Sequence, residues 1–140
     1  MNWHYLLPPL VAWTIAQLIK VLTRSIRKRR LDLRALAEMG GMPSSHSAMV
    51  IALTTTIARI NGASSAAFAI ALIFSLVVMY DAAGVRRAAG RQATVLNRLV
   101  DDLVAQRGLQ EERLRELLGH TPIEVFVGAA LGIVVGLLLT

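Results

Sequence analysis

The sequence predicts an all-α integral membrane protein, a helical bundle with about four transmembrane helices and an amphipathic cytoplasmic helical loop. Two observations lead to this fold class. Of the 140 residues, 55% are hydrophobic and only 17% are charged, which is too apolar for a typical soluble domain of this size. The apolar residues also gather into stretches long enough to cross a hydrocarbon core of about 30 Å. We expect one membrane-embedded domain over residues 1–140.

Four stretches have the composition of membrane spans. The expected spans are residues 3–23, 45–60, 64–83 and 121–139. The second is the shortest and carries three threonines, so we expect it to be either buried among the other helices or slightly re-entrant. In the last span, Gly128, Gly132 and Gly136 recur on one helix face, which permits close helix contact. That contact serves either a homodimer or the bundle itself.

Basic residues separate sharply between the two sides of the membrane. They gather in "RSIRKRR" after the first span and in the loop of residues 85–119, whereas the turn "NGASS" carries no charge. The positive-inside rule therefore predicts a multi-pass protein of the inner cell membrane, with both basic loops in the cytoplasm and both termini outside. The net charge of +6 favours acidic partners such as anionic lipid or phosphate. No nucleic-acid partner is expected, because no aromatic platform accompanies the arginines.

The loop over residues 85–119 is too long to be a simple connection. In its stretch "QATVLNRLVDDLVAQRG", apolar residues recur at helical spacing with charged residues opposite them. This pattern predicts an amphipathic helix that lies on the membrane surface or on the bundle.

The four helix ends that face the cytoplasm bring hydroxyl and ionisable side chains together. These residues are Lys20, Ser44, Ser45, His46, Asp81, Arg86, Arg87, His120 and Glu124. Ionisable groups at the edge of the hydrocarbon are costly unless they are paired or used, so a functional site on this face is the default hypothesis. Because the chain has no cysteine, its chemistry must come from histidine, serine, carboxylate or basic groups. His4 lies at the opposite side.

The stretch "GGMPSSHSA" has two interpretations. In the first, Ser44 or Ser45 caps the second helix by accepting from its first amides, and Pro43 rigidifies the approach. In the second, the same helix N-terminus binds phosphate with its unpaired N–H groups and positive dipole end, and His46 faces the anion. Capping is compatible with both interpretations.

The stretch "GHTPIEV" has a similar pair of interpretations. Thr121 to Glu124 matches a capping box with proline at the first helical position, in which Glu124 binds backbone amides. His120 and Glu124 are also four residues apart, so the carboxylate can accept from one imidazole nitrogen. The other nitrogen is then unprotonated and able to attack. The choice depends on where the helix begins.

Three further sets of charged residues have alternative roles. Lys20 either extends to the interface or donates to a phosphate. Arg86 and Arg87 are either charges at the inner surface or holders of a phosphoryl group, for which a planar guanidinium is well suited. Asp81 either orients one of these cations or sits in a structural ion pair.

Three stretches, "GGMPSSHSA", "MYDAAGVRRAAGRQATVLN" and "LGHTPIEVFVG", lie in that order between apolar helices. Together they closely resemble the divergent type 2 phosphatidic acid phosphatase family, which is related to acid phosphatases and vanadium-dependent haloperoxidases. The resemblance covers about residues 17–132. It implies a membrane phosphatase that hydrolyses a lipid phosphate or isoprenoid diphosphate through a phosphohistidine. It also implies that the reaction needs no metal and no cofactor.

The first two superfamily motifs carry over with one departure each. The first motif, a lysine seven residues before an arginine, matches Lys20 and Arg27, with Lys28 where proline is expected. The second, P-S-G-H, matches the stretch from Pro43 to His46, with serine in place of glycine. The resemblance implies that this histidine protonates the leaving group.

The third motif calls for Ser-Arg, five residues, His, three residues and Asp. His120 and Glu124 reproduce the histidine-to-acid spacing with glutamate for aspartate, while Leu114 stands where arginine is expected. The resemblance implies that His120 attacks phosphorus and that Glu124 orients it. Arg86 or Arg87 would supply the missing guanidinium. The competing class is a non-catalytic membrane protein that binds phosphorylated lipid or acts as a carrier or assembly component.

Overall fold

The structure, a computed structural model, describes residues 3–31, 41–83, 92, 94–97, 99–101 and 120–140. Four long helices account for most of these described residues. They are α1 (Trp3–Lys28), α2 (Ser45–Asn61), α3 (Ala66–Ala83) and α5 (Pro122–Leu139). The all-α class is confirmed, and each long helix coincides with an expected span. The largest difference is in α1, which continues into the basic segment as far as Lys28.

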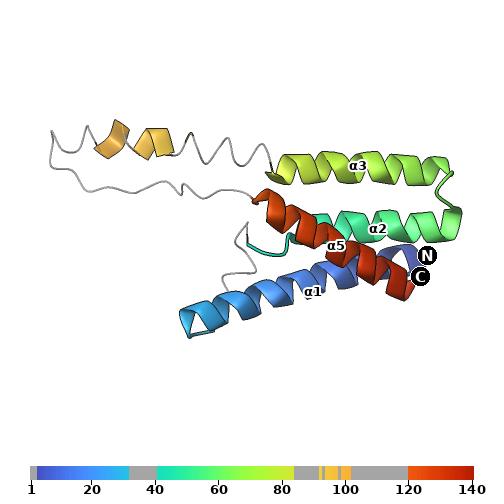
Figure 1. Cartoon of the computed structure of the whole chain (residues 1–140), viewed down its shortest axis with the longest axis horizontal. Coiled ribbons are helices and arrows are strands. Elements are labelled where there is room, and N and C mark those ends of the chain that lie inside the picture. The colour runs from blue at the N-terminus through green and yellow to red at the C-terminus, as the bar shows by residue number, and fades with distance from the viewer. Residues whose placement is uncertain (1–2, 32–40, 84–91, 93, 98, 102–119) are drawn as a thin grey trace.

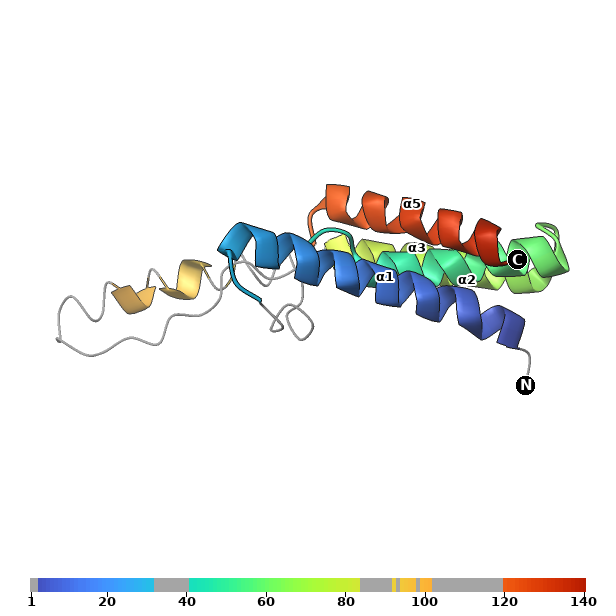
Figure 2. The same cartoon turned by 90° about the horizontal axis from the view of Figure 1, so that it is seen from below.

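The second helix is the centre of the bundle. It packs against α1, α3 and α5, and α5 also packs against α1, whereas α3 and α5 share the least contact of the helix pairs that touch. Figures 1 and 2 show that each helix runs opposite to the one before it and that α5 crosses α2. The N- and C-terminal ends consequently lie at the same end of the bundle (Figure 1). The starts of α2 and α5 lie at the other end, together with the end of α3.

Three of the helices, α1, α3 and α5, are long and apolar enough to cross a membrane. The second helix has 17 residues, and its neighbours bury Ser47, Thr54 and Thr56 along it. We expected this polar stretch to be either buried among the other helices or slightly re-entrant, and in the structure it is a helix packed among the others. Its role as a fourth membrane span stays a prediction.

The glycines of α5 allow it to lie directly against α2. A Cβ atom at Gly132 would stand 2.5 Å from the Ala48 carbonyl oxygen, and one at Gly136 would stand 2.7 Å from Thr55 Cβ. Because lipid chains are as apolar as the side chains, helices in a bilayer associate through close packing of this kind. The glycine stripe therefore serves the bundle. The homodimer stays a prediction that this stripe no longer supports.

Hydroxyl groups join α2 to α3 inside the bundle. Thr54 Oγ1 lies 2.7 Å from Ser75 Oγ and 3.0 Å from the carbonyl oxygen of Val50. Ser75 Oγ in turn donates to the same Val50 carbonyl at 3.1 Å. A hydroxyl group buried away from water is costly without a partner. The polar residues of α2 are therefore accommodated by contacts with α3 rather than by exposure to lipid.

The expected amphipathic helix falls partly outside the described residues. Residues 94–97 and 99–101 are helical, and the apolar side chains of Val95, Leu96 and Leu99 are exposed there. These exposed side chains agree with a helix whose apolar face meets the membrane surface. The remainder of the expected loop helix lies outside the described residues.

Replacing Gly132 with valine is expected to destabilise the protein by about 3 kcal/mol or more, because the new side chain collides with backbone atoms of α2. Thermal unfolding in detergent micelles would measure the loss. Ala130→Val is the control, because Ala130 is on the exposed face of the same helix. Equal melting temperatures for the two variants would contradict the close α2–α5 contact.

Candidate functional site

The two serines at the start of α2 have different partners. Ser44 is the N-cap, and its Oγ accepts from the Ser47 backbone N–H at 3.4 Å and lies 3.1 Å from Ser47 Oγ. Ser45 instead accepts a hydrogen bond from Lys20 Nζ at 3.2 Å. Capping thus belongs to Ser44, which leaves Ser45 to join the start of α2 to α1.

Lys20 is held inside the bundle. Only 4% of its surface is exposed, although it lies in the membrane-crossing part of α1. Of the two sequence interpretations, extension to the interface is therefore wrong. A cation buried at the edge of the hydrocarbon is rare, which makes Lys20 a candidate for a functional site. Lys20 lies where it can donate to an anion bound at the start of α2.

His120 and Glu124 form a hydrogen-bonded pair that also caps α5. Glu124 Oε2 lies 3.1 Å from His120 Nδ1 and accepts from the Thr121 backbone N–H at 3.0 Å. The Thr121 hydroxyl accepts from the Glu124 N–H at 3.4 Å, which completes the capping box. The capping contacts and the histidine–carboxylate contact are therefore both present, because one carboxylate oxygen makes both.

This contact determines which nitrogen of His120 carries the proton. An ionised carboxylate only accepts hydrogen bonds, so Nδ1 is the protonated nitrogen of the neutral ring. Nε2 then has the lone pair. Among the described residues, Nε2 is buried and has no hydrogen-bond partner. A buried nitrogen acceptor without a partner is unusual in a folded protein, which makes Nε2 a candidate functional atom.

The surroundings of His120 keep its ring neutral. Burial lowers the pKa of His120 from its ordinary value, and the charge of Lys20 acts in the same direction. The hydrogen bond to Glu124 opposes this shift without overcoming it. At pH 7 the imidazole is therefore uncharged, as a nitrogen nucleophile must be.

His46 lies beside His120, and the centroids of their rings are 6.2 Å apart with the ring planes at 68°. His46 is exposed, whereas the His120 side chain is fully buried. The two imidazoles are therefore neighbours, as a common site for one phosphoryl group would require. One ring is thus open to solvent exchange while the other is protected from it.

Backbone hydrogen bonds hold the three helix ends together. The Ser44 N–H donates to the Glu124 carbonyl at 2.9 Å, and the His120 N–H donates to the Ala82 carbonyl at 3.2 Å. The first of these bonds needs Gly128, because a Cβ atom there would stand 2.3 Å from the Ser44 carbonyl oxygen. The start of α5 is therefore attached both to the start of α2 and to the end of α3.

The structure does not bring all of the predicted residues together. Asp81 is in the last turn of α3 with an exposed side chain, next to Ala82, whose carbonyl binds His120. Arg86 and Arg87 lie outside the described residues, and so does the side chain of Arg27. The assignment of an arginine to the third motif stays a prediction.

Two glycines shape the site, and the sequence interpretation gave them no role in it. Gly41 has a φ of +91°, which favours glycine, and it packs near the stem of Lys20. In the sequence, the feature that could have indicated the role of Gly41 is the glycine pair shortly before Pro43. Gly128 belongs to the spacing-four stripe that indicated helix contact. Nothing in the sequence showed that this contact would reach the helix cap at Ser44.

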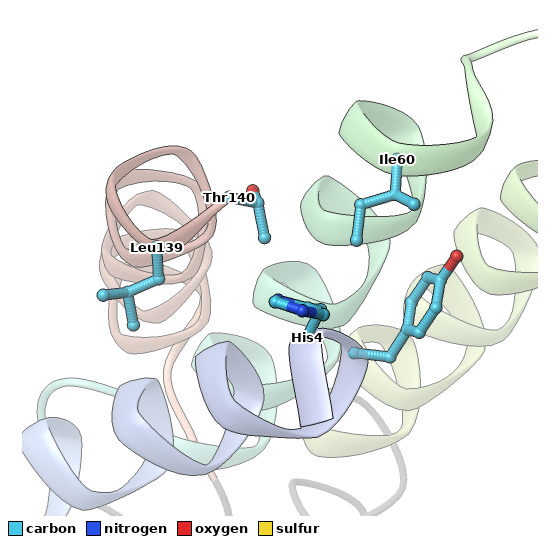
Figure 3. A pocket seen from close by; sticks show the side chains of 5 residues that line it. His4, Ile60, Leu139 and Thr140 are labelled. Atoms are coloured by element: carbon cyan, nitrogen blue, oxygen red, sulfur yellow. The ribbon is translucent and has the colours of Figure 1, made fainter. Parts of the chain in front are cut away.

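A pocket lies at the end of the bundle opposite to this site. His4, Tyr5, Ile60, Leu139 and Thr140 line a cavity of about 430 Å³ (Figure 3). It lies between the first residues of α1 and the last residues of α2 and α5. His4 is therefore separate from the site of His46 and His120, as the sequence predicted.

The chain is an α-helical membrane protein with a polar site where its helix ends meet. Residues 1–135 match the Divergent PAP2 family, and the chain belongs to that family. The resemblance inferred from the three motifs is thereby confirmed. The uncharacterized membrane protein YuiD of Bacillus subtilis (strain 168) is 46% identical to this chain over an alignment of 145 positions. The alignment covers 96% of this chain and 92% of YuiD. No solved structure matches the chain.

His120 is expected to titrate below the ordinary imidazole pKa of about 6.5, because burial disfavours its charged form. Glu124→Gln removes the group that raises this pKa, so the pKa should fall further. An NMR titration of the histidine rings would measure both values, with His120→Gln identifying the signal. A pKa at or above 6.5 in the unmodified protein would contradict the buried, neutral ring.

Proposed function

We propose that this protein is a membrane phosphatase that hydrolyses a lipid phosphate or an isoprenoid diphosphate from the cytoplasmic face. The observation that carries the proposal is the His120–Glu124 pair beside His46. A histidine with one nitrogen bound to a carboxylate and the other unprotonated is a prepared nucleophile. The buried lysine nearby supplies the positive charge that a phosphate requires.

In the first step, His120 Nε2 attacks the phosphorus atom. The N–P bond forms as the bond from phosphorus to the leaving oxygen breaks, and His46 gives its proton to that oxygen. The ring of His120 becomes positively charged during the attack. Glu124 stabilises this charge through Nδ1–H and keeps the ring oriented.

In the second step, water attacks the phosphorus atom of the phosphohistidine. His46, now neutral, accepts a proton from that water, and the N–P bond breaks. Inorganic phosphate leaves and His120 returns to its neutral form. Both steps use one acid–base group and one nucleophile, so neither requires a metal or a cofactor.

The oxygens of phosphate that do not react need donors. Lys20 already donates to Ser45 Oγ, so the ammonium group and this hydroxyl are positioned as a pair. The first backbone N–H groups of α2 add further donors, and the positive end of the dipole of that helix attracts the anion. Arg86, Arg87 and Asp81 are assigned to the same phosphate site on the sequence alone.

A second candidate function is binding of phosphorylated lipid without cleavage. Two observations favour it. His120 Nε2 is buried, so a phosphorus atom must displace part of its surroundings to reach it. Ser45 also adds a side chain where the superfamily motif has glycine, close to the position a phosphate would occupy. Binding and catalysis differ in whether a phosphohistidine forms.

The test is release of inorganic phosphate by the purified protein from a panel of lipid phosphates and isoprenoid diphosphates. His120→Ala should reduce release to background, and His46→Ala should reduce it by about 10²–10⁴-fold. His4→Ala is the matched control, because His4 lies at the opposite end of the bundle. Its activity should equal that of the unmodified protein.

Two results would count against the proposal. Activity that survives both His120→Ala and His46→Ala would remove the proposed chemistry. If no substrate of the panel is cleaved while the same lipids still bind, the second candidate function is favoured instead.

A further inference from the structure

An apolar groove of about 590 Å³ lies between α3 and α5. It is at the end of the bundle where α3 ends and α5 begins. Its walls are apolar apart from the Tyr80 hydroxyl. Its lining includes Ile73, Val77 and Tyr80 on α3 and Pro122, Val125 and Phe126 on α5.

The groove results from the way the helices are attached. The start of α5 is bound to the end of α3 through His120 and Ala82, and from there α5 crosses α2 and moves away from α3 (Figure 1). The glycine face of α5 holds it against α2. Hydroxyl contacts at Thr54 and Ser75 hold α3 to α2 on another side. The two helices therefore diverge, and a groove is left between them.

The groove begins at the candidate phosphate site. Ala83, which lines it, follows Ala82, whose carbonyl accepts from the His120 N–H. Pro122, which also lines it, is two residues after His120. A molecule with a phosphate at His120 and an apolar chain would therefore meet the groove directly below its headgroup.

The dimensions of the groove suit a single chain. Ile73 and Ala83 are ten residues apart, which is about 15 Å along a helix. That distance is half of a hydrocarbon core of about 30 Å, so the groove extends through one leaflet. Its volume has room for about 20 groups of the size of a water molecule or a methylene. One lipid chain therefore fits this volume.

We propose that this groove holds one hydrocarbon chain of a phosphorylated lipid of the cytoplasmic leaflet while the phosphate lies against His120. The inference rests on the proposed function for the headgroup. Lipid chains are as apolar as the groove, so the chain adds little affinity there. Its contribution is orientation, because a chain seated between α3 and α5 brings its phosphate to the starts of α2 and α5.

The test is photo-crosslinking of the full chain in phosphatidylcholine vesicles. The probe is dodecylphosphonate with a diazirine at the end of its chain, which keeps a phosphate-like headgroup and has no ester to hydrolyse. Because the diazirine is at the chain end, label should concentrate at the end of the groove far from His120, in residues 73–77 of α3 and near Phe126 of α5. Excess unlabelled dodecylphosphonate should remove it, whereas dodecanol, which has the same chain without the anion, should not.

A pair of tryptophan variants tests the groove itself. Val77→Trp fills the groove and should reduce the labelling at least about fivefold. Ile70→Trp is the control, because Ile70 is two turns away on the same face of α3 and is similarly exposed, but does not line the groove. Both side chains face lipid, so both variants should fold.

Labelling that is unchanged in Val77→Trp, or that dodecanol removes equally well, would overturn the inference, because the groove would then hold only ordinary boundary lipid. Failure of the proposed hydrolysis gives a different result. In that case no lipid phosphate is cleaved, yet the phosphonate still labels the groove and Val77→Trp still prevents it.

Discussion

The site depends on the direct contact between the backbones of α2 and α5. The Ser44 N–H donates to the Glu124 carbonyl at 2.9 Å, and the glycine at position 128 leaves the space for this approach. Backbone polar groups that are buried away from water, as at Ser44, need such partners. The bond places two helix starts at the same depth. As a result, His46 and His120, which are far apart in the sequence, face each other.

Helix capping and the proposed chemistry use the same atoms. Glu124 Oε2 accepts from the Thr121 N–H, which stabilises the start of α5, and from His120, which fixes the tautomer of the proposed nucleophile. The position of the imidazole is therefore as rigid as the helix end itself. At α2 the two tasks are divided between neighbours, since Ser44 caps the helix and Ser45 accepts from Lys20. Such rigidity favours catalysis, because reacting groups gain most when they are held in place beforehand.

The burial of Lys20 connects the electrostatics of the site with its location in the membrane. A buried ammonium group is costly, and its charge lowers the pKa of His120 in addition to the effect of burial. The same charge attracts the anion that the site is proposed to bind. Lipid phosphates combine this anion with an apolar chain, and the bundle presents a polar site at one end and an apolar groove beside it. Both features adjoin the His120–Pro122 segment.

The helical membrane class, the four long helices and the grouping of Lys20, His46, His120 and Glu124 at one end could be predicted from the amino-acid sequence, because apolar length and helix caps are local properties. The sequence also identified His46, His120, Glu124 and Lys20 as candidates. Only the tertiary structure decided that Lys20 is buried and that the glycines serve the bundle. It also decided that Glu124 has both of its predicted partners. These outcomes depend on how α1, α3 and α5 pack around α2, and helix periodicity does not specify which faces meet.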